Sequence, residues 1–338
     1  MNMTDRSSEG ARTDFVGVVV IGRNEGARLE TCLASVSGSS CVVYVDSGST
    51  DNSVDLAAAM GAHVVELDRK TPFTAARARN AGFQRLITMS NGLRYIQFVD
   101  GDCELIEGYL SEAVRFMEMH SEVAVLCGRR FERFPEASIF NKMCHHEWNT
   151  PVGEASSCGG DSIVRVTPFK EVGGFRNEQI AHEEPELCSR LRQAGHKIWR
   201  FDMPMALHDA GMSRVGQFYS RSRRAGFGIT QYMDNASPGY RNDGSGIVIR
   251  ALIWSIIPPA LALGGAMLLS PNAFWFLLIY PAQIIRFAVK LTLHDYRPIE
   301  AFKVSTLSMI GRFAEAHGAL EYLCKKLLRS QMRAILYK

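Results

Sequence analysis

Short apolar runs alternate with helix-like stretches along the N-terminal part of the chain, and this alternation constrains the fold more than any other feature. The runs are rich in β-branched and aromatic residues, as buried strands are. They are Phe15–Gly22, Val42–Asp46, His63–Leu67, Tyr95–Asp100 and Val123–Gly128. The helix-like stretches are Ala27–Ser37, Ser53–Met60, Thr74–Met89 and Glu107–His120. This order predicts an α/β fold with a Rossmann-like mixed, mainly parallel sheet and helices on both faces.

Composition supports a large folded core in a chain of balanced charge. Of the 338 residues, 46% are hydrophobic and 22% are charged, which excludes a wholly disordered chain. The net charge of +3 is too small to indicate nucleic acid, and we expect no nucleic-acid partner. The 8 cysteines form no Cys-x-x-Cys pair and no zinc spacing. Residues 1–14, expected to be disordered, lack the apolar stretch of a signal peptide, so we expect reduced thiols and a cytosolic catalytic part.

An uncharged segment follows the alternating region. Ala251–Leu269 is about as long as a bilayer-spanning helix, and Ala273–Ile285 follows after a Ser-Pro-Asn turn. Residues 246–293 are therefore expected to form a membrane-associated hairpin, with cations at both open ends facing the cytoplasm. Because Pro258-Pro259 would interrupt a simple span, a buried helix pair of a soluble domain and a re-entrant hairpin remain alternatives.

Residues 294–338 are expected to form an amphipathic basic helical tail. Phe302–Leu336 has helical periodicity, with cations on one face: Arg312, Lys325, Lys326, Arg329 and Arg333. Such a face suits a helix lying on anionic lipid. The alternative is a solvated helix packed on the catalytic domain, which we place at residues 15–240.

Acidic residues follow the predicted strands, at the edge where α/β sheets bind ligands. Asp100-Gly101-Asp102 follows Tyr95–Asp100, and two carboxylates on a tight turn can converge on a hard divalent cation. The alternative is an ordinary solvated turn. A second turn, Asp46-Ser47-Gly48-Ser49-Thr50-Asp51, could hold a nucleoside or cap the next helix.

Further polar groups lie at the same edge. Ile21-Gly22-Arg23-Asn24-Glu25 closes the first strand, and Arg77-Ala78-Arg79-Asn80 could direct guanidinium groups at a diphosphate. His182-Glu183-Glu184-Pro185 precedes apolar residues at helical spacing. Pro185 is expected at the first helical position, with Glu184 at the helix N-terminus and Gly195 just past its end. The helix dipole would keep such a carboxylate ionised as a base, unless the cluster only caps the helix.

The order of these motifs resembles the family-2 glycosyltransferases with the GT-A fold, which transfer a sugar from a nucleotide donor with inversion. The resemblance covers about Phe15 to Gly228 and is carried by IGRNE, DSGSTD, ARARNAGF, DGD, GGDSIVR and EEPELCSRLRQAG. It implies a nucleotide-sugar site formed by Ile21, Arg23, Glu25, Asp46, Ser47, Arg77, Arg79, Asp100, Gly101 and Gly160. Ser47 departs from the commoner second acidic residue of the family, which leaves the nucleotide undetermined among UDP, GDP and dTDP.

The same resemblance implies the metal and the base. Asp100, Asp102 and His208 would hold Mn²⁺ or Mg²⁺ on the diphosphate, although His208 could equally belong to a polar loop. Glu184 is the expected general base, and Glu183 orients the acceptor or its loop.

Arg223 belongs to a basic segment that could neutralise a diphosphate or form a solvated helix face. Processive relatives in the family carry Gln-x-x-Arg-Trp near this place. Here the Arg-Trp is absent, which favours single sugar addition over polymer extrusion. His145-His146 has no partner spacing and is interpreted as structural or as part of the acceptor site.

Together these features predict an inverting, metal-assisted glycosyltransferase at the cytoplasmic face of a bacterial inner membrane. Its expected acceptor is a lipid-linked saccharide of envelope or exopolysaccharide assembly. The alternatives are transfer to a polyprenyl phosphate, which needs no base, and a non-catalytic membrane-tethered protein that binds sugar nucleotides.

Overall fold

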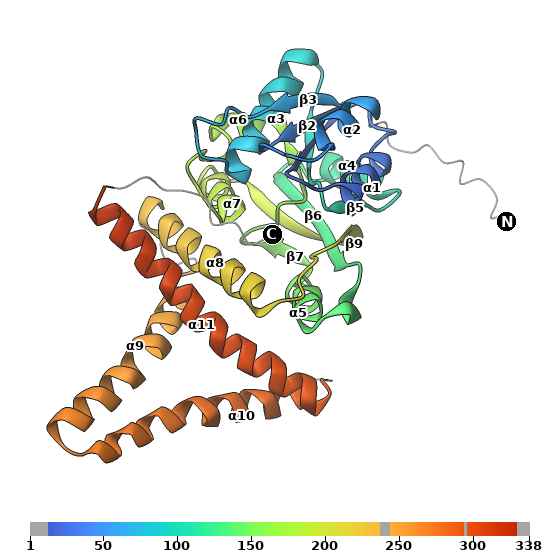
Figure 1. The fold of residues 1–338 in the computed structure, drawn as a ribbon. Coiled ribbons are helices and arrows are strands. Elements are labelled where there is room, and N and C mark those ends of the chain that lie inside the picture. Colours follow the sequence, from blue (N-terminus) through green and yellow to red (C-terminus); the bar gives the residue numbers. More distant parts are fainter. Residues whose placement is uncertain (1–12, 237–243, 294–295, 330–338) are drawn as a thin grey trace. The chain divides into compact units, whose positions relative to one another are not determined.

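The computed structural model describes residues 13–236, 244–293 and 296–329 (Figure 1). The chain forms two compact units. The first contains residues 1–133, 147–177 and 184–210, and the second contains residues 134–146, 178–183 and 211–338. The expected division at residues 240, 246 and 294 stays a prediction, and the expected disorder of residues 1–14 falls largely outside the described range. The two units are described separately below.

A 9-stranded mixed sheet forms the centre of the first unit, in the order β3-β2-β1-β4-β8-β6-β9-β5, with β7 paired to β9. Its strands are β1 (Val16–Gly22), β2 (Cys41–Asp46), β3 (His63–Glu66), β4 (Tyr95–Asp100), β5 (Cys103–Leu105), β6 (Val123–Glu132), β7 (Gly153–Ala155), β8 (Ser162–Arg165) and β9 (Lys197–His208). The four strands from β3 to β4 are parallel, as expected. β8 runs antiparallel to both β4 and β6, so the parallel order is broken at the centre.

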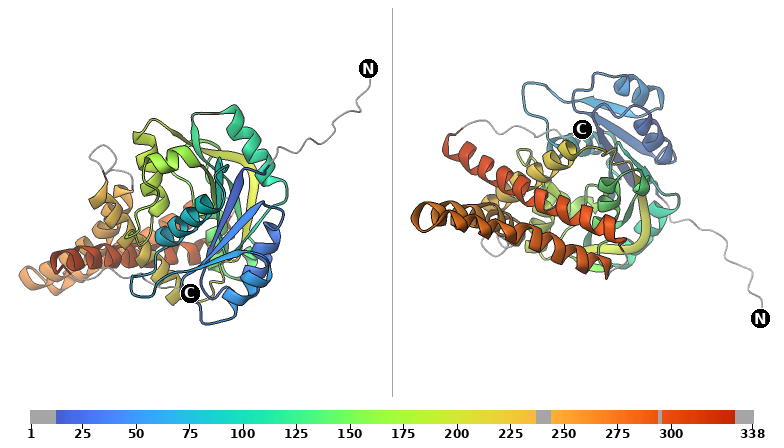
Figure 2. Two further views of the ribbon diagram at one scale, coloured as in Figure 1. Left: turned by 90° about the horizontal axis from the view of Figure 1, so that it is seen from above. Right: turned by 60° about the horizontal axis from the view of Figure 1, so that its bottom comes forward.

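Helices cover both faces of this sheet (Figure 2, left). Val16, Val18 and Val20 of β1 belong to the core on one face, whereas Val19 and Ile21 belong to the core on the other. This alternation explains why β1 is apolar throughout, because successive side chains of a strand point to opposite faces. The first core includes α1 (Ala27–Ser35), α2 (Ser53–Ala59) and α4 (Tyr109–Met119); the second includes α3 (Ala75–Met89), α6 (Val166–Glu171) and α7 (Glu183–Gln193).

Helices make up the second unit. They are η1 (Pro135–Ala137), α5 (Ile139–Glu147), α8 (Val215–Asn235), α9 (Ser245–Leu268), η3 (Pro271–Leu278), α10 (Ile279–Thr292) and α11 (Pro298–Leu327). α8 and α11 lie side by side (Figures 1 and 2). Glycines allow this close approach, because a Cβ added at Gly318 would clash with the carbonyl oxygen of Arg223. A Cβ at Gly226 would clash with Glu315 in the same way.

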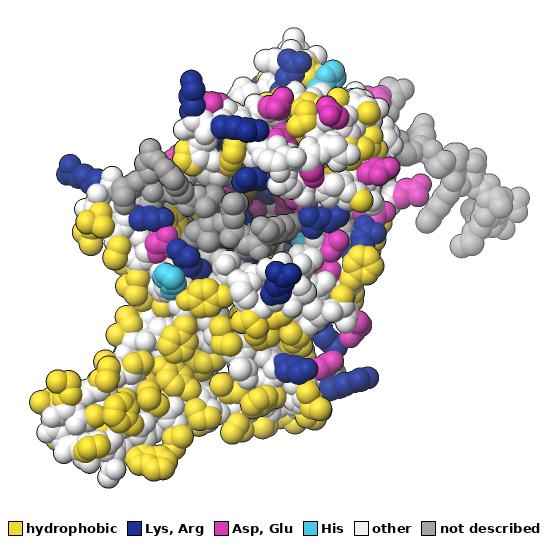
Figure 3. Space-filling model, in the orientation of Figure 1, with side chains coloured by type: hydrophobic (Ala, Val, Ile, Leu, Met, Phe, Trp, Pro, Cys, Tyr) yellow, Lys and Arg dark blue, Asp and Glu magenta, His cyan; other side chains and the backbone are white. Residues whose placement is uncertain are grey.

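Two helical segments of this unit are long and apolar enough to cross a membrane, Ser245–Leu268 and Pro271–Thr292. Only 22% and 6% of their apolar windows are buried, so their side chains form the hydrophobic surface of α9, η3 and α10 in Figure 3. A core helix pair of a soluble domain would be mostly buried, so this exposure speaks against that alternative. The expectation that Pro258 and Pro259 interrupt the first segment is wrong, since α9 continues through both.

The basic tail helix buries one side in the second unit. α11 packs a stripe of small residues against its neighbours, including Ala301, Gly311, Ala314 and Gly318. Three of its expected cations form ion pairs: Lys325 with Glu321, Lys326 with Asp234 and Arg312 with Glu315. Arg333 lies outside the described residues. Contact of this helix with lipid stays a prediction.

Candidate active site

Backbone hydrogen bonds join the loops that follow β1 and β2. The N–H of Ser47 donates to the carbonyl oxygen of Gly22 at 3.0 Å, and the N–H of Gly101 donates to that of Ile21 at 2.8 Å. Asn24 has a left-handed φ of 56°, and its side-chain Oδ1 accepts from the N–H of Thr50 at 2.7 Å. These bonds fix the carboxyl ends of β1, β2 and β4 against one another.

Asp46, at the end of β2, holds its own turn. Its side chain is buried and accepts from the N–H groups of Gly48 and Ser49, each at 2.8 Å. The Tyr44 hydroxyl donates to it at 3.1 Å. The geometry therefore gives Asp46 a role in shaping the turn, while its contact with a nucleoside stays a prediction.

A network of arginines and carboxylates lies at the end of β4. Arg79 of α3, only 2% exposed, donates to Asp100 at 2.8 Å. Arg130 of β6 is 2.6 Å from Asp161 and 3.9 Å from Asp100, and Asp161 accepts from the N–H of Asp100 at 2.8 Å. Burial alone would raise the pKa of Asp100, but Arg79 and Arg130 bring it below its ordinary value. Asp100 is thus held as a carboxylate.

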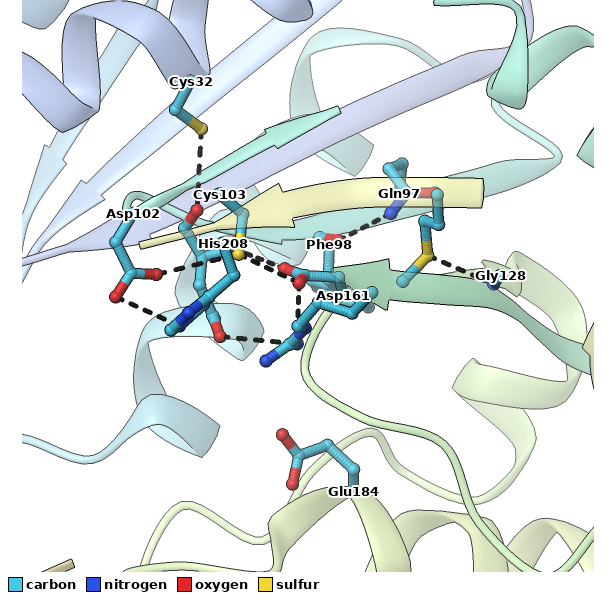
Figure 4. Close-up of polar contacts among 12 residues, drawn as sticks. Cys32, Gln97, Phe98, Asp102, Cys103, Gly128, Asp161, Glu184 and His208 are labelled. Atoms are coloured by element: carbon cyan, nitrogen blue, oxygen red, sulfur yellow. Dashed lines mark hydrogen bonds and ion pairs between the residues drawn. The ribbon is translucent and has the colours of Figure 1, made fainter. Parts of the chain in front are cut away.

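Three adjacent residues present donor atoms that could hold a metal ion: Asp102, Cys103 and His208, within 4.8 Å of one another (Figure 4). His208, at the end of β9, has Nε2 3.4 Å from Oδ2 of Asp102. Burial and the neighbouring Asp161 raise the pKa of the Cys103 thiol, which donates to Asp161 at 3.1 Å. A neutral thiol is a poor ligand for a hard cation, so Asp102 and His208 are the residues that fit Mn²⁺ or Mg²⁺.

Glu184 of α7 points toward the same network (Figure 4). Its Oε1 is 3.4 Å from Nη1 of Arg79. A Cβ added at Gly160 would meet the guanidinium of Arg79 and would lie 2.9 Å from Oδ2 of Asp100 and 3.1 Å from Oε1 of Glu184, so these side chains converge on Gly160. Glu184 lies in the first turn of α7, where the helix dipole favours a negative charge.

The helix that carries Glu184 begins earlier than the sequence indicated. α7 begins at Glu183, so Pro185 is its third residue and not its first. The expected stop is confirmed, because Gly195 follows the helix with φ +88°. Glu183 is buried, and its expected orienting role stays a prediction.

Several predicted site residues have other partners in the structure. Arg77 donates to the carbonyl oxygens of Asp68 and Thr71, at 3.0 and 2.9 Å, and so holds the loop before α3. Arg23 lies over the ring of Phe73. Two more predicted residues form ion pairs: Glu25 with Arg28 at 2.7 Å, and Arg223 with Glu321 at 2.7 Å in the second unit. In the same unit the His146 ring packs on Tyr296.

Arg130 was missed by the sequence analysis, and Asp161 entered it only as part of the GGDSIVR motif of the family resemblance. Arg130 follows an apolar strand and has no motif of its own. The one signal for Asp161 was its position between a glycine pair and a strand.

Residues 17–169 match the family model described as Glycosyl transferase family 2. The chain carries a family-2 glycosyltransferase domain. The match includes Asp46, Asp100 and Asp102 but ends before Glu184 and His208. Outside the family model, only the geometry above supports a role for those two residues in the glycosyltransferase.

The glycosyltransferase is also similar to a curated protein and to a solved structure. It is 25% identical over 247 residues to the succinoglycan biosynthesis protein ExoA of Rhizobium meliloti (strain 1021), with 66% of this chain and 72% of that protein covered. The mannosyltransferase PcManGT from Pyrobaculum calidifontis, solved with GDP-Man and Mn²⁺, has a TM-score of 0.56 and 16% identity. That match covers 92% of this chain and 89% of the neighbour, and it shows a shared GT-A-like fold.

Proposed function

We propose that this glycosyltransferase moves a sugar, with inversion, from a nucleoside diphosphate to a hydroxyl of a lipid-linked saccharide. One observation carries the proposal: Glu184 faces Asp100 and Arg79 across Gly160, on the edge of the sheet that also holds Asp102 and His208. A base and a cation-binding pair at one strand edge are what such a transfer needs.

In this proposal Asp102 and His208 hold a divalent cation, which offsets the negative charge of the departing diphosphate when bound. The Mn²⁺ of the Pyrobaculum mannosyltransferase supports this assignment. Arg79 places a further positive charge at the same edge of the sheet. Its ion pair with Asp100 fixes the position of its guanidinium. The nucleotide is a UDP, GDP or dTDP sugar, and the GDP-Man of the structural neighbour makes GDP-mannose the first donor to test.

Glu184 acts as the general base. Its carboxylate removes the proton of the acceptor hydroxyl as the oxygen attacks the anomeric carbon, opposite the diphosphate. The absence of a side chain at Gly160 lets Glu184, Asp100 and Arg79 approach one another, which keeps the base next to the charged network at the end of β4.

The acceptor and location follow from two further features. The curated relative takes part in succinoglycan biosynthesis, which favours a saccharide of an exopolysaccharide. The exposed apolar segments of α9, η3 and α10 favour anchoring in the membrane, with catalysis at its cytoplasmic face and a lipid carrier for the acceptor.

The test is sugar transfer by the full chain in detergent, with Mn²⁺, radiolabelled nucleotide sugars and lipid-linked acceptors. We expect Glu184→Gln to lower kcat by roughly 10²-fold or more while donor binding persists, because only the proton acceptor is lost. Asp102→Ala should abolish Mn²⁺-dependent transfer and donor hydrolysis. Glu154→Gln, which removes an exposed carboxylate of β7, is the matched control and should be fully active.

Two outcomes contradict the proposal in different ways. Undiminished transfer to a polyprenyl phosphate by Glu184→Gln would indicate an acceptor that is already anionic. Nucleotide binding without hydrolysis or transfer of any donor would indicate a non-catalytic binding protein.

A further inference from the structure

Glu132 lies beside His208 although neither the motifs nor the family resemblance singled it out. It is the last residue of β6, and the register of β6 with β9 places it opposite His208. Its side chain is fully buried. A buried carboxylate requires compensating partners, so its position next to an imidazole needs a physical explanation.

The carboxylate faces the ring nitrogen of His208 that points away from Asp102. Oε2 of Glu132 is 3.6 Å from Nδ1 of His208, slightly longer than a hydrogen bond, and accepts from the N–H of Ala210 at 3.1 Å. On the other side of the ring, Nε2 is 3.4 Å from Oδ2 of Asp102. The Trp148 ring packs edge-on against the imidazole, with centroids 4.6 Å apart, which restricts rotation of the ring.

Carboxylate oxygens face both nitrogens of the imidazole, Asp102 at Nε2 and Glu132 at Nδ1. A cation bound beside Asp102 needs the lone pair of Nε2, so the ring proton then lies on Nδ1, where the Glu132 carboxylate can accept it. Histidines that bind metals usually direct their second nitrogen at such a carboxylate, which fixes the ring and makes it a better ligand.

We propose that Glu132 is a positioning residue that holds His208 in its Nδ1-protonated form, with Nε2 free to bind the cation beside Asp102. The inference rests on the proposed function for the identity of that cation. Glu132 itself does not contact the reacting atoms; it acts through His208.

The first measurement is the affinity of the full chain for Mn²⁺, from the electron paramagnetic resonance signal of free Mn²⁺, with and without GDP or UDP. Glu132→Gln keeps the size of the side chain but can also donate to Nδ1, so we expect Mn²⁺ binding to weaken about tenfold or more. Glu104→Gln is the matched control: it removes a carboxylate from the neighbouring strand β5, where Glu104 pairs with Arg133. Its Mn²⁺ affinity should equal that of the wild type.

The second measurement reads the tautomer in the presence of saturating Mg²⁺, which is diamagnetic and takes the place of Mn²⁺. Nitrogen chemical shifts of ¹⁵N-histidine-labelled protein at pH 8.5, assigned with His208→Gln, should show Nδ1 of His208 protonated in the wild type. In Glu132→Gln the Nε2-protonated form should appear. Because the wild-type spectrum does not depend on the variant folding, protonation of Nε2 there overturns the proposal by itself.

The proposal would also be overturned if Glu132→Gln bound Mn²⁺ with an affinity within about twofold of the wild type. A residue that orients a metal ligand should cause a larger loss of affinity. Failure of the wild type to bind Mn²⁺ at all would instead contradict the metal-assisted function. That outcome would also overturn this inference, whereas an unchanged Mn²⁺ affinity of Glu132→Gln overturns the inference alone.

Discussion

At the residue scale, Arg79 is a buried cation that pairs with two carboxylates of the candidate site. Its guanidinium is 2% exposed and serves two carboxylates, Asp100 at 2.8 Å and Glu184 at 3.4 Å. It also lies over the Phe175 ring. Removing a cation from a buried group of charges leaves the partner carboxylates without compensation, which costs far more than the loss of a surface pair.

We therefore expect Arg79→Met to lower the free energy of unfolding by about 3 kcal/mol, measured by chemical denaturation of the full chain in detergent. Arg115→Met is the control, because Arg115 forms a pair with Glu112 on the exposed side of α4. That substitution should cost less than about 1 kcal/mol. Equal losses for the two variants would show that Arg79 does not compensate buried charge.

The sequence predicted the site residues that lie at the ends of recognisable strands. It missed residues that reach the site only because distant strands pair in the sheet. Asp100 ends β4 and Asp102 follows it, and His208 was placed by its similarity to a family ligand. Arg130 reaches Asp161 only because β8 lies between β4 and β6. No local sequence pattern predicts the contact of Arg130 with Asp161, because it depends on the pairing of segments that are distant in the chain.

At the element scale, α8 and α11 approach so closely that glycine is required at the contact. A Cβ at Gly318 would clash with the backbone of Arg223, and backbone cannot move aside as a side chain can. Two ion pairs reinforce the contact, Arg223–Glu321 and Lys326–Asp234. The small residues of α11 thus serve packing, a role that its basic periodicity did not indicate.

Gly318→Ala should lower the free energy of unfolding of the full chain by about 1–3 kcal/mol, because the added methyl group forces the helices apart. Gly216→Ala in α8 is the matched control, since nothing lies within 4 Å of its added Cβ. That variant should be neutral or more stable by up to about 1 kcal/mol through helix propensity. Stabilisation by both substitutions would contradict a close helix contact.

The helices α1 to α4 and the strands β1 to β4 could be predicted because each is long enough to show its period. β5 and β7 have 3 residues each, too few for alternation to be visible. α7 begins two residues before Pro185 because Glu183 and Glu184 also fit a first helical turn. The unbroken course of α9 through Pro258 and Pro259 shows that a long apolar helix can contain two prolines in its interior, which the sequence analysis did not expect.

At the scale of the whole molecule, the chain combines a catalytic sheet with a large exposed apolar surface. Exposed side chains of α9 and η3 include Ile257, Leu261, Trp275 and Leu278. Hydrophobic side chains gather on one part of the surface in Figure 3. Patches of this extent on soluble proteins are rare and usually contact a membrane or another protein. A membrane is the expected environment, because both segments have the length and hydropathy to cross one.

This expectation is testable by flotation of the full chain with phosphatidylethanolamine–phosphatidylglycerol vesicles. The paired substitution Ile257→Arg and Leu261→Arg places two charges near the middle of α9, where each costs about 2.5–3.5 kcal/mol in a bilayer. We expect the wild type to float with the vesicles and this variant to lose that association. Met60→Arg with Met119→Arg makes the same chemical change at exposed residues of the first unit and should float like the wild type. Flotation of the α9 variant at the wild-type level would show that these residues do not enter the bilayer. The apolar surface would then be better explained as a site that binds another protein.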